Sequence, residues 1–109
     1  MSFFTVLGEY EGLKFIELKK ILFDEKVADM VESNNAVFPP ELLNNIVATD
    51  SFPLSQQRLC RVLEGYDIGL PPISVEKSLG DKYTLQNGRH RVTAAILRGD
   101  SIIPSIVVV

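Results

Sequence analysis

Apolar and polar residues alternate along two neighbouring runs, residues 73–77 and 82–86, which predicts two β-strands. The residues between them, 78–81, contain Gly80, so we expect the two strands to form a hairpin. Residues 102–109 are apolar on consecutive positions and rich in Val and Ile, as in a strand covered on both faces. Pro104 within this run indicates an irregular start or an edge position. Residues 14–18 predict one further short strand.

Helical spacing of apolar residues predicts three helices in the first two thirds of the chain. Asp24 is the expected N-cap of a helix of about ten residues that ends near residues 33–35. Pro40 is well placed to begin a second, short helix, and Ser55 is expected to cap a third. The predicted inward stripes are Val27, Met30 and Val31; Leu42, Leu43, Ile46 and Val47; and Leu59, Val62, Leu63 and Tyr66. Arg58 and Arg61 lie off the third stripe and are interpreted as solvated. Residues 1–12 fit either a short edge strand or an ordered arm.

The strand at residues 82–86 leads through Asn87 and Gly88 into a predicted helix over residues 88–98. Asn87 is the expected N-cap, and Gly99 suits the left-handed position after the last helical turn. The predicted inward face of this helix is made by small and β-branched residues, namely Val92, Ala95, Ile96 and Gly99. With the strand at 102–109 it makes a βαβ-like unit. If both strands are parallel in one sheet, the turn at 87–91 lies where open α/β sheets bind ligands.

Arg89, His90 and Arg91 occupy the first turn of this helix, where the positive end of the helix dipole disfavours cations. An incoming anion reverses that balance, because free backbone N–H groups, the dipole and two guanidinium groups then act on one phosphate-like group. The alternative interpretation is that all three are solvated surface cations. The anion interpretation makes Asn87, Gly88, Arg89, His90 and Arg91 candidate phosphate- or nucleotide-binding residues.

The composition limits the classes of protein to which this chain can belong. The 109 residues are 46% hydrophobic with a net charge of −3, which fits one domain over residues 1–109 and argues against indiscriminate coating of nucleic acid. The single cysteine, Cys60, excludes an intramolecular disulfide and a CxxC zinc site, and its apolar neighbours predict a buried thiol. We found neither a signal peptide nor a membrane span in the sequence, so we expect a cytoplasmic protein. The predicted class is α/β (α+β), a small mixed sheet with helices.

Residues 71–109 resemble the ParB N-terminal/sulfiredoxin fold family. The resemblance is carried by Pro72–Val75, by the run from Tyr83 to Ala95 containing Asn87-Gly88-Arg89-His90-Arg91, by Gly99, and by Ile103-Pro104-Ser105-Ile106-Val107. It implies a ParB/sulfiredoxin-like domain, of the ParB-like nuclease type, that binds the phosphates of a nucleotide at this helix N-terminus. Gly88, Arg91 and His90 match telling positions of the family.

Two departures narrow what the resemblance implies. Arg89 stands where sulfiredoxins carry their catalytic cysteine, which argues against sulfiredoxin chemistry. ParB proper has Glu at that place and an Arg where this chain has Thr93, which argues against clamping of DNA on CTP.

Two classes of function therefore stay open. The first is a nucleotide-binding module with ATP or CTP as ligand, in which weak nucleotidase, kinase-like or nuclease activity would use His90 as acid/base. Phosphoryl chemistry would add Mg²⁺, held by an acid such as Asp24, Glu25 or Glu17. The second is a non-catalytic DNA-associated or protein-interaction factor of a plasmid, phage or partition-related system. A third alternative is a domain without a ligand, in which the apolar run 106–109 is an exposed edge that pairs between chains.

Overall fold

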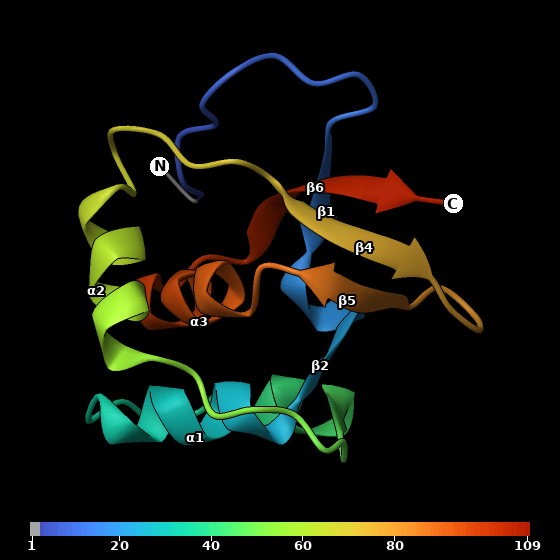
Figure 1. The fold of residues 1–109 in the computed structure, drawn as a ribbon. Helices are drawn as coiled ribbons and strands as arrows, with labels where there is room; N and C mark the ends of the chain where they lie inside the picture. Colours follow the sequence, from blue (N-terminus) through green and yellow to red (C-terminus); the bar gives the residue numbers. More distant parts are fainter. Residues whose placement is uncertain (1–2) are drawn as a thin grey trace.

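The computed structural model describes residues 3–109 and arranges six strands of this part of the chain in one mixed sheet, together with three α-helices (Figure 1). The strands are β1 (Lys14–Glu17), β2 (Ile21–Asp24), β3 (Ile46–Val47), β4 (Ile73–Lys77), β5 (Tyr83–Asn87) and β6 (Ile102–Val108). The helices are α1 (Glu25–Ser33), α2 (Gln56–Glu64) and α3 (Arg89–Arg98), with short 3₁₀ helices η1 (Leu18–Lys20) and η2 (Pro40–Asn45). The predicted mixed α/β class is confirmed.

The strand order is β1-β6-β4-β5-β2-β3. The hairpin of β4 and β5 is antiparallel, as predicted, with an irregularity between Ser74 and Val75. Strands β2 and β5 run parallel, so their carboxyl ends lie at the same edge of the sheet. Helix α1 begins directly after β2, and α3 begins one residue after β5. This pairing brings together the first turns of two helices that are more than sixty residues apart in sequence.

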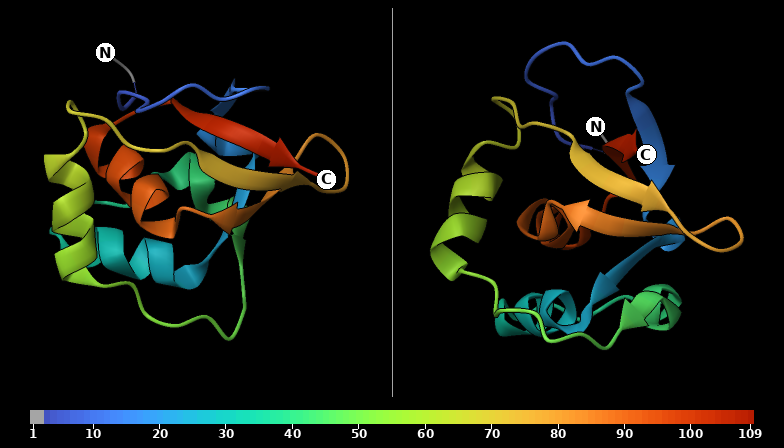
Figure 2. Two further views of the ribbon diagram at one scale, coloured as in Figure 1. Left: turned by 45° about the horizontal axis from the view of Figure 1, so that its top comes forward. Right: turned by 45° about the vertical axis from the view of Figure 1, so that its right-hand side comes forward.

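Helix α3 lies between the sheet and the other two helices, as the two views of Figure 2 show. Five consecutive residues of α3 are buried: Val92, Thr93, Ala94, Ala95 and Ile96. Of the predicted inward face, Val92, Ala95 and Ile96 are buried, but Gly99 is exposed, and Thr93 and Ala94 are buried in addition because α3 is covered from several sides. Small side chains allow this close packing, and Thr93 is tolerated because its hydroxyl donates to the Arg89 carbonyl at 2.8 Å.

The first and third predicted helices are confirmed, with their caps. The Asp24 side chain accepts from the Lys26 N–H at 2.9 Å, and the Ser55 side chain accepts from the Arg58 N–H at 3.2 Å. The second predicted helix is wrong in its type and its end. Residues 40–45 form the 3₁₀ helix η2, and Ile46 and Val47 leave it to pair with β2. Two β-branched residues at an open sheet edge gain strand hydrogen bonds there, which explains the early end.

Strand β2 was not predicted. The sequence signal is the apolar run Ile21-Leu22-Phe23 immediately before the Asp24 cap, in which Ile21 and Phe23 are buried. The missed strand matters for function, because it delivers Asp24 to the edge of the sheet where α3 begins.

The parallel arrangement considered for the βαβ-like unit does not occur. Strand β4 pairs antiparallel with β5 and parallel with β6, so β5 and β6 are antiparallel and lie on either side of β4. Ile106 to Val108 belong to β6 and pair with β4 on one side, while β1 pairs with β6 only over residues 102–105, so pairing of the run 106–109 between chains stays a prediction. Pro104 pairs only with Phe15 of β1, one residue before pairing with β4 starts at Ser105, so its missing N–H costs no bond to β4.

The amino-terminal segment is an ordered arm over its described residues, 3–13, while residues 1 and 2 of the predicted region lie outside them. Phe4 is fully buried, and Thr5 exchanges backbone hydrogen bonds with Tyr66 and Leu70. Cys60 is exposed, which corrects the predicted buried thiol. It lies one position beyond Leu59 on α2, and that step of about 100° turns it out of the inward stripe.

Within residues 3–109, no helix combines the length and the apolar character needed to cross a membrane.

Candidate anion-binding site at the start of α3

The turn into α3 depends on Gly88, which has a φ of +116° and is the N-cap of the helix. A Cβ at this position would lie 2.5 Å from Cγ2 of Ile73, a fully buried residue of β4. Both the backbone conformation and the close approach of β4 therefore require glycine. Asn87 was predicted as the N-cap, and this is wrong: it is the last residue of β5, and α3 has no side-chain cap.

The absence of a capping side chain leaves the first turn of α3 with backbone donors. The first helical bond runs from the Val92 N–H to the Gly88 carbonyl at 2.8 Å. The N–H groups of Arg89, His90 and Arg91 have no acceptor among residues 3–109. Three such donors at the positive end of a ten-residue helix are the backbone part of an anion site.

Arg89 is held by the chain's own groups. Its Nε lies 2.7 Å from Asp24 Oδ2, and its Nη2 also donates to the carbonyl oxygen of Phe52. The Arg89 side chain is 29% exposed and that of Asp24 only 9%. The interpretation of Arg89 as a solvated surface cation is therefore wrong. Asp24 neutralises part of the positive charge, but its carboxylate does not cap α3.

Arg91 is also engaged, although with neutral partners. Its Nη1 donates to the carbonyls of Pro71 and Pro72 at 2.8 and 2.7 Å, and its Nη2 lies 3.5 Å from Asn87 Oδ1. Burial lowers the pKa of Arg91, while the nearby Tyr10 acts in the opposite direction. A guanidinium remains protonated in this setting, so Arg91 fixes the segment before β4 and keeps its full positive charge.

His90 connects α3 with the segment before α2. Its Nε2 accepts a hydrogen bond from the Ser55 N–H at 2.9 Å, which places the ring proton of the neutral form on Nδ1. Burial lowers the pKa of His90, and the positive charges of Arg58, Arg89 and Arg91 lower it further. His90 is accordingly neutral near pH 7, and the lone pair that a general base would use is occupied.

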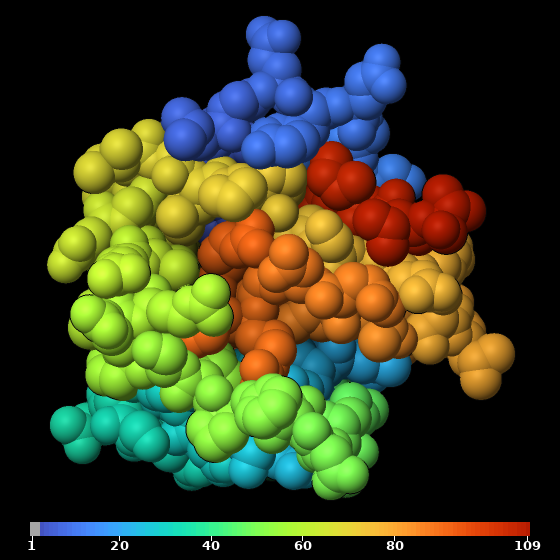
Figure 3. All heavy atoms as spheres, in the orientation of Figure 1, coloured from blue at the N-terminus to red at the C-terminus, as the bar shows by residue number. Residues whose placement is uncertain are grey.

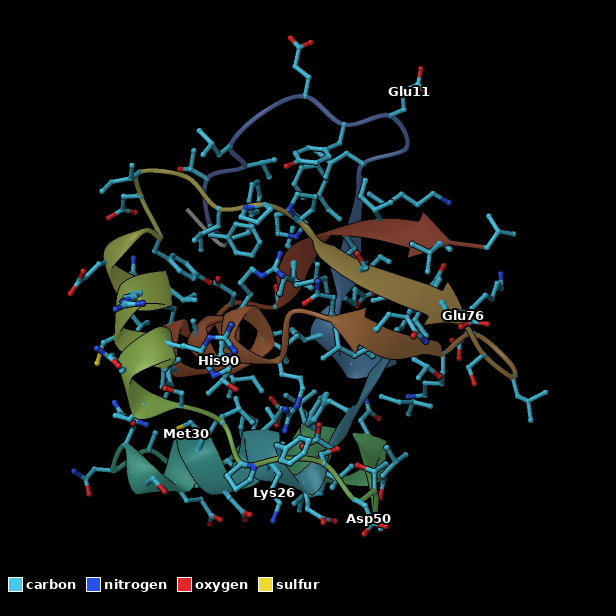
Figure 4. All side chains as sticks on the ribbon, in the orientation of Figure 1. Glu11, Lys26, Met30, Asp50, Glu76 and His90 are labelled. Atoms are coloured by element: carbon cyan, nitrogen blue, oxygen red, sulfur yellow. The ribbon has the colours of Figure 1, made fainter. Side chains whose placement is uncertain are left out.

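An open pocket of about 310 Å³ lies over this turn. Its lining residues are Asn87, Gly88, Arg89, His90 and Arg91 from the β5–α3 turn, with Arg58, Arg61 and Val62 from α2. Figure 4 shows His90 on the side of α3 that faces α2. In Figure 3 the orange atoms of this turn lie on one face of the molecule, next to the yellow-green atoms of α2. All five predicted site residues thus line one pocket.

Arg58 and Arg61 are the pocket residues that sequence reasoning missed. Both are exposed, and no carboxylate of the described chain forms an ion pair with either. The sequence signal was their spacing of three on a helix, which puts two cations on one face. That spacing does not predict which element this face of α2 lies against. The packing of α2 against α3 places the face beside His90.

No carboxylate of the described residues lines this pocket. Of the acids considered as holders of Mg²⁺, Asp24 pairs with Arg89, Glu17 pairs with Lys19 and Lys20 away from the pocket, and Glu25 does not line the pocket. Within residues 3–109, no group of three or more His, Cys, Asp or Glu side chains is placed to hold a metal ion. The residues present suit a phosphate-like anion and supply no carboxylate within the described residues to hold Mg²⁺ in this pocket.

No protein-family model matches the chain, and no curated protein sequence matches it.

Proposed function

We propose that this protein is a phosphate-binding domain that takes the phosphate groups of a nucleotide at the start of α3, in the manner that its resemblance to the ParB N-terminal/sulfiredoxin family implies. The observation that carries the proposal is one pocket in which four arginines, uncapped helical N–H groups and no carboxylate come together. Electrostatic attraction, the helix dipole and hydrogen bonding favour the same class of ligand there.

Binding is favoured over turnover by the state of His90. Its Nε2 accepts from the Ser55 backbone, and its lowered pKa keeps it neutral at pH 7. The Nδ1–H is the remaining polar group of the ring and suits donation to a phosphate oxygen. We therefore assign His90 the role of a hydrogen-bond donor to the ligand; an acid/base role would first require the Ser55 contact to open.

The test is a titration of ¹⁵N-labelled protein with ATP, CTP and GTP, with and without Mg²⁺, followed by backbone amide shifts. We expect saturable binding with a Kd of about 1 mM or tighter, and the largest shifts at the amides of Arg89, His90 and Arg91. Lys26 provides an internal control, because its N–H at the start of α1 is already bonded to Asp24. The proposal fails if no nucleotide shifts these three amides, or if the largest shifts lie elsewhere. Binding of a DNA oligonucleotide alone would instead favour the DNA-associated alternative.

A further inference from the structure

The arginines of the pocket fall into two pairs with different partners. Arg89 and Arg91, which stand on the helix itself, already donate to Asp24, to the Phe52 carbonyl and to the carbonyls of Pro71 and Pro72. Arg58 and Arg61, which come from α2, are exposed and form no hydrogen bond or ion pair through their guanidinium groups within the described residues. Among the arginines, the guanidinium groups available to a ligand are therefore those of α2, and the backbone N–H groups of α3 and the Nδ1–H of His90 add to them.

These two sets of donors line the same pocket from different elements. The α3 set lies at the Gly88–Arg91 turn, and the α2 set lies on the helix packed beside it. Arg58 is close enough to His90 for its charge to lower the pKa of that ring. A single phosphate at the helix N-terminus can bind the α3 donors. A chain of two or three phosphates carries enough negative charge to bind the α3 and the α2 donors together.

The pocket offers little to a nucleobase. Among residues 3–109, Val62 is the single apolar side chain of its lining, and no aromatic residue of this part of the chain belongs to it. Bases are normally recognised by stacking on aromatic or guanidinium planes and by fixed hydrogen bonds to their edges. A pocket of 310 Å³ lined by four arginines has charge for phosphates, and without an aromatic platform a base could stack only on the guanidinium groups that the phosphates attract.

From these observations, and resting on the proposed function, we infer that the site binds a di- or triphosphate chain between the start of α3 and Arg58 and Arg61 of α2, with little selectivity for the group attached to it. A nucleoside triphosphate and an inorganic polyphosphate are two sources of this chemistry. The open but small pocket and the net charge of −3 favour such a ligand over an extended nucleic-acid strand.

The experiment measures Kd by isothermal titration calorimetry at fixed ionic strength for phosphate, pyrophosphate, tripolyphosphate, ATP, CTP, GTP and adenosine. We expect affinity to rise with the number of phosphates, the three nucleotides and tripolyphosphate to agree within about threefold, and adenosine not to bind. Because a hydrogen bond between charged groups is worth more than a neutral one, Arg58→Gln and Arg61→Gln should each weaken tripolyphosphate binding roughly tenfold. Both side chains are exposed, so the variants should fold like the unmodified protein.

Arg98→Gln is the matched control, because Arg98 lies in the last turn of α3, away from the pocket, and its loss should leave Kd unchanged. The inference is overturned if nucleotides bind but one base is preferred more than tenfold over the others and over tripolyphosphate. It is equally overturned if Arg58→Gln and Arg61→Gln bind tripolyphosphate like the unmodified protein, or if a single-stranded DNA 12-mer binds more tightly than tripolyphosphate. Absence of binding by every phosphate compound would instead defeat the proposed function itself.

Discussion

Helices α1 and α3 start at the same edge of the sheet, after two parallel strands, yet their first turns are built in opposite ways. Helix α1 has an acidic N-cap, Asp24, and Glu25 in its first turn, as the helix dipole favours. Helix α3 has a glycine N-cap, no capping side chain and three basic or titratable residues. One carboxylate serves both turns, since Asp24 caps α1 and pairs with Arg89 of α3. The chain thus satisfies one helix N-terminus internally and leaves the other with open donors.

The largest expected effect comes from removing the glycine that lets α3 start where it does. Gly88→Ala places a methyl group against Ile73 in a left-handed backbone conformation, and we expect it to lower the free energy of unfolding by about 3 kcal/mol. Urea denaturation followed by circular dichroism measures this. Gly12→Ala is the control for backbone strain alone, because Gly12 has a φ of +74° and nothing within 4 Å of its added Cβ. That variant should lose only about 1 kcal/mol, and equal losses would refute the steric argument.

The second-largest expected effect distinguishes the two roles of Asp24, as the cap of α1 and as the partner of Arg89. Asp24→Ala removes the cap of α1 and the partner of Arg89, and should cost about 2 kcal/mol in the free energy of unfolding. Asp24→Asn keeps a good capping side chain and removes only the charge, so it should cost about half as much. By freeing Arg89, the Asn variant should also bind tripolyphosphate more tightly than the unmodified protein. Denaturation and calorimetry on the two variants test this, and identical behaviour of both would show that Asp24 acts through one contact only.

The smallest expected effect is a pH dependence that belongs to the α3 turn. The pKa of His90 is lowered in the folded protein, so between that pKa and 6.5 the unfolded chain binds more protons than the folded one. Stability from this group is present above pH 6.5 and is lost as the pH falls toward the folded pKa. His90→Gln should remove this part of the decline. We expect the difference in free energy of unfolding between pH 7.5 and 5.5, in a buffer without phosphate, to be smaller in the variant. Parallel pH profiles would contradict the neutral state of His90.

Anion binding should reverse this pH dependence of His90. A bound phosphate chain adds negative charge beside the ring, raises its pKa and favours proton uptake. Burial and, after it, the charges of Arg58 on α2 and of Arg89 and Arg91 on α3 hold that pKa down in the free protein, so neutralising these charges relieves the repulsion. Binding of tripolyphosphate should therefore take up protons near pH 6, visible as a dependence of the calorimetric heat on buffer ionisation enthalpy. The His90→Gln variant should take up fewer protons, and what remains measures the titration of tripolyphosphate, whose own phosphates also titrate at about pH 6.

Much of the fold could be predicted because its signals are local. Several features depend only on residues close in sequence: the caps at Asp24 and Ser55, the hairpin of residues 73–87 and the end of α3 at Gly99. The failures share a different cause. Residues 46 and 47 become a strand because β2 lies beside them, and β5 and β6 are antiparallel because β4 lies between them. Pairing partners distant in sequence leave no periodic trace in either segment.

By itself the sequence determined that a strand leads through glycine into a helix whose first turn carries Arg89, His90 and Arg91, because turn chemistry and helical periodicity act over a few residues. The contacts of those side chains depend on the tertiary structure. Asp24 reaches Arg89 through the parallel pairing of β2 with β5, and Ser55 reaches His90 through the packing of α2 on α3. The same packing brings Arg58 and Arg61 to the pocket. Such contacts join segments more than twenty-five residues apart, and their free energy depends on the assembled sheet rather than on any local pattern.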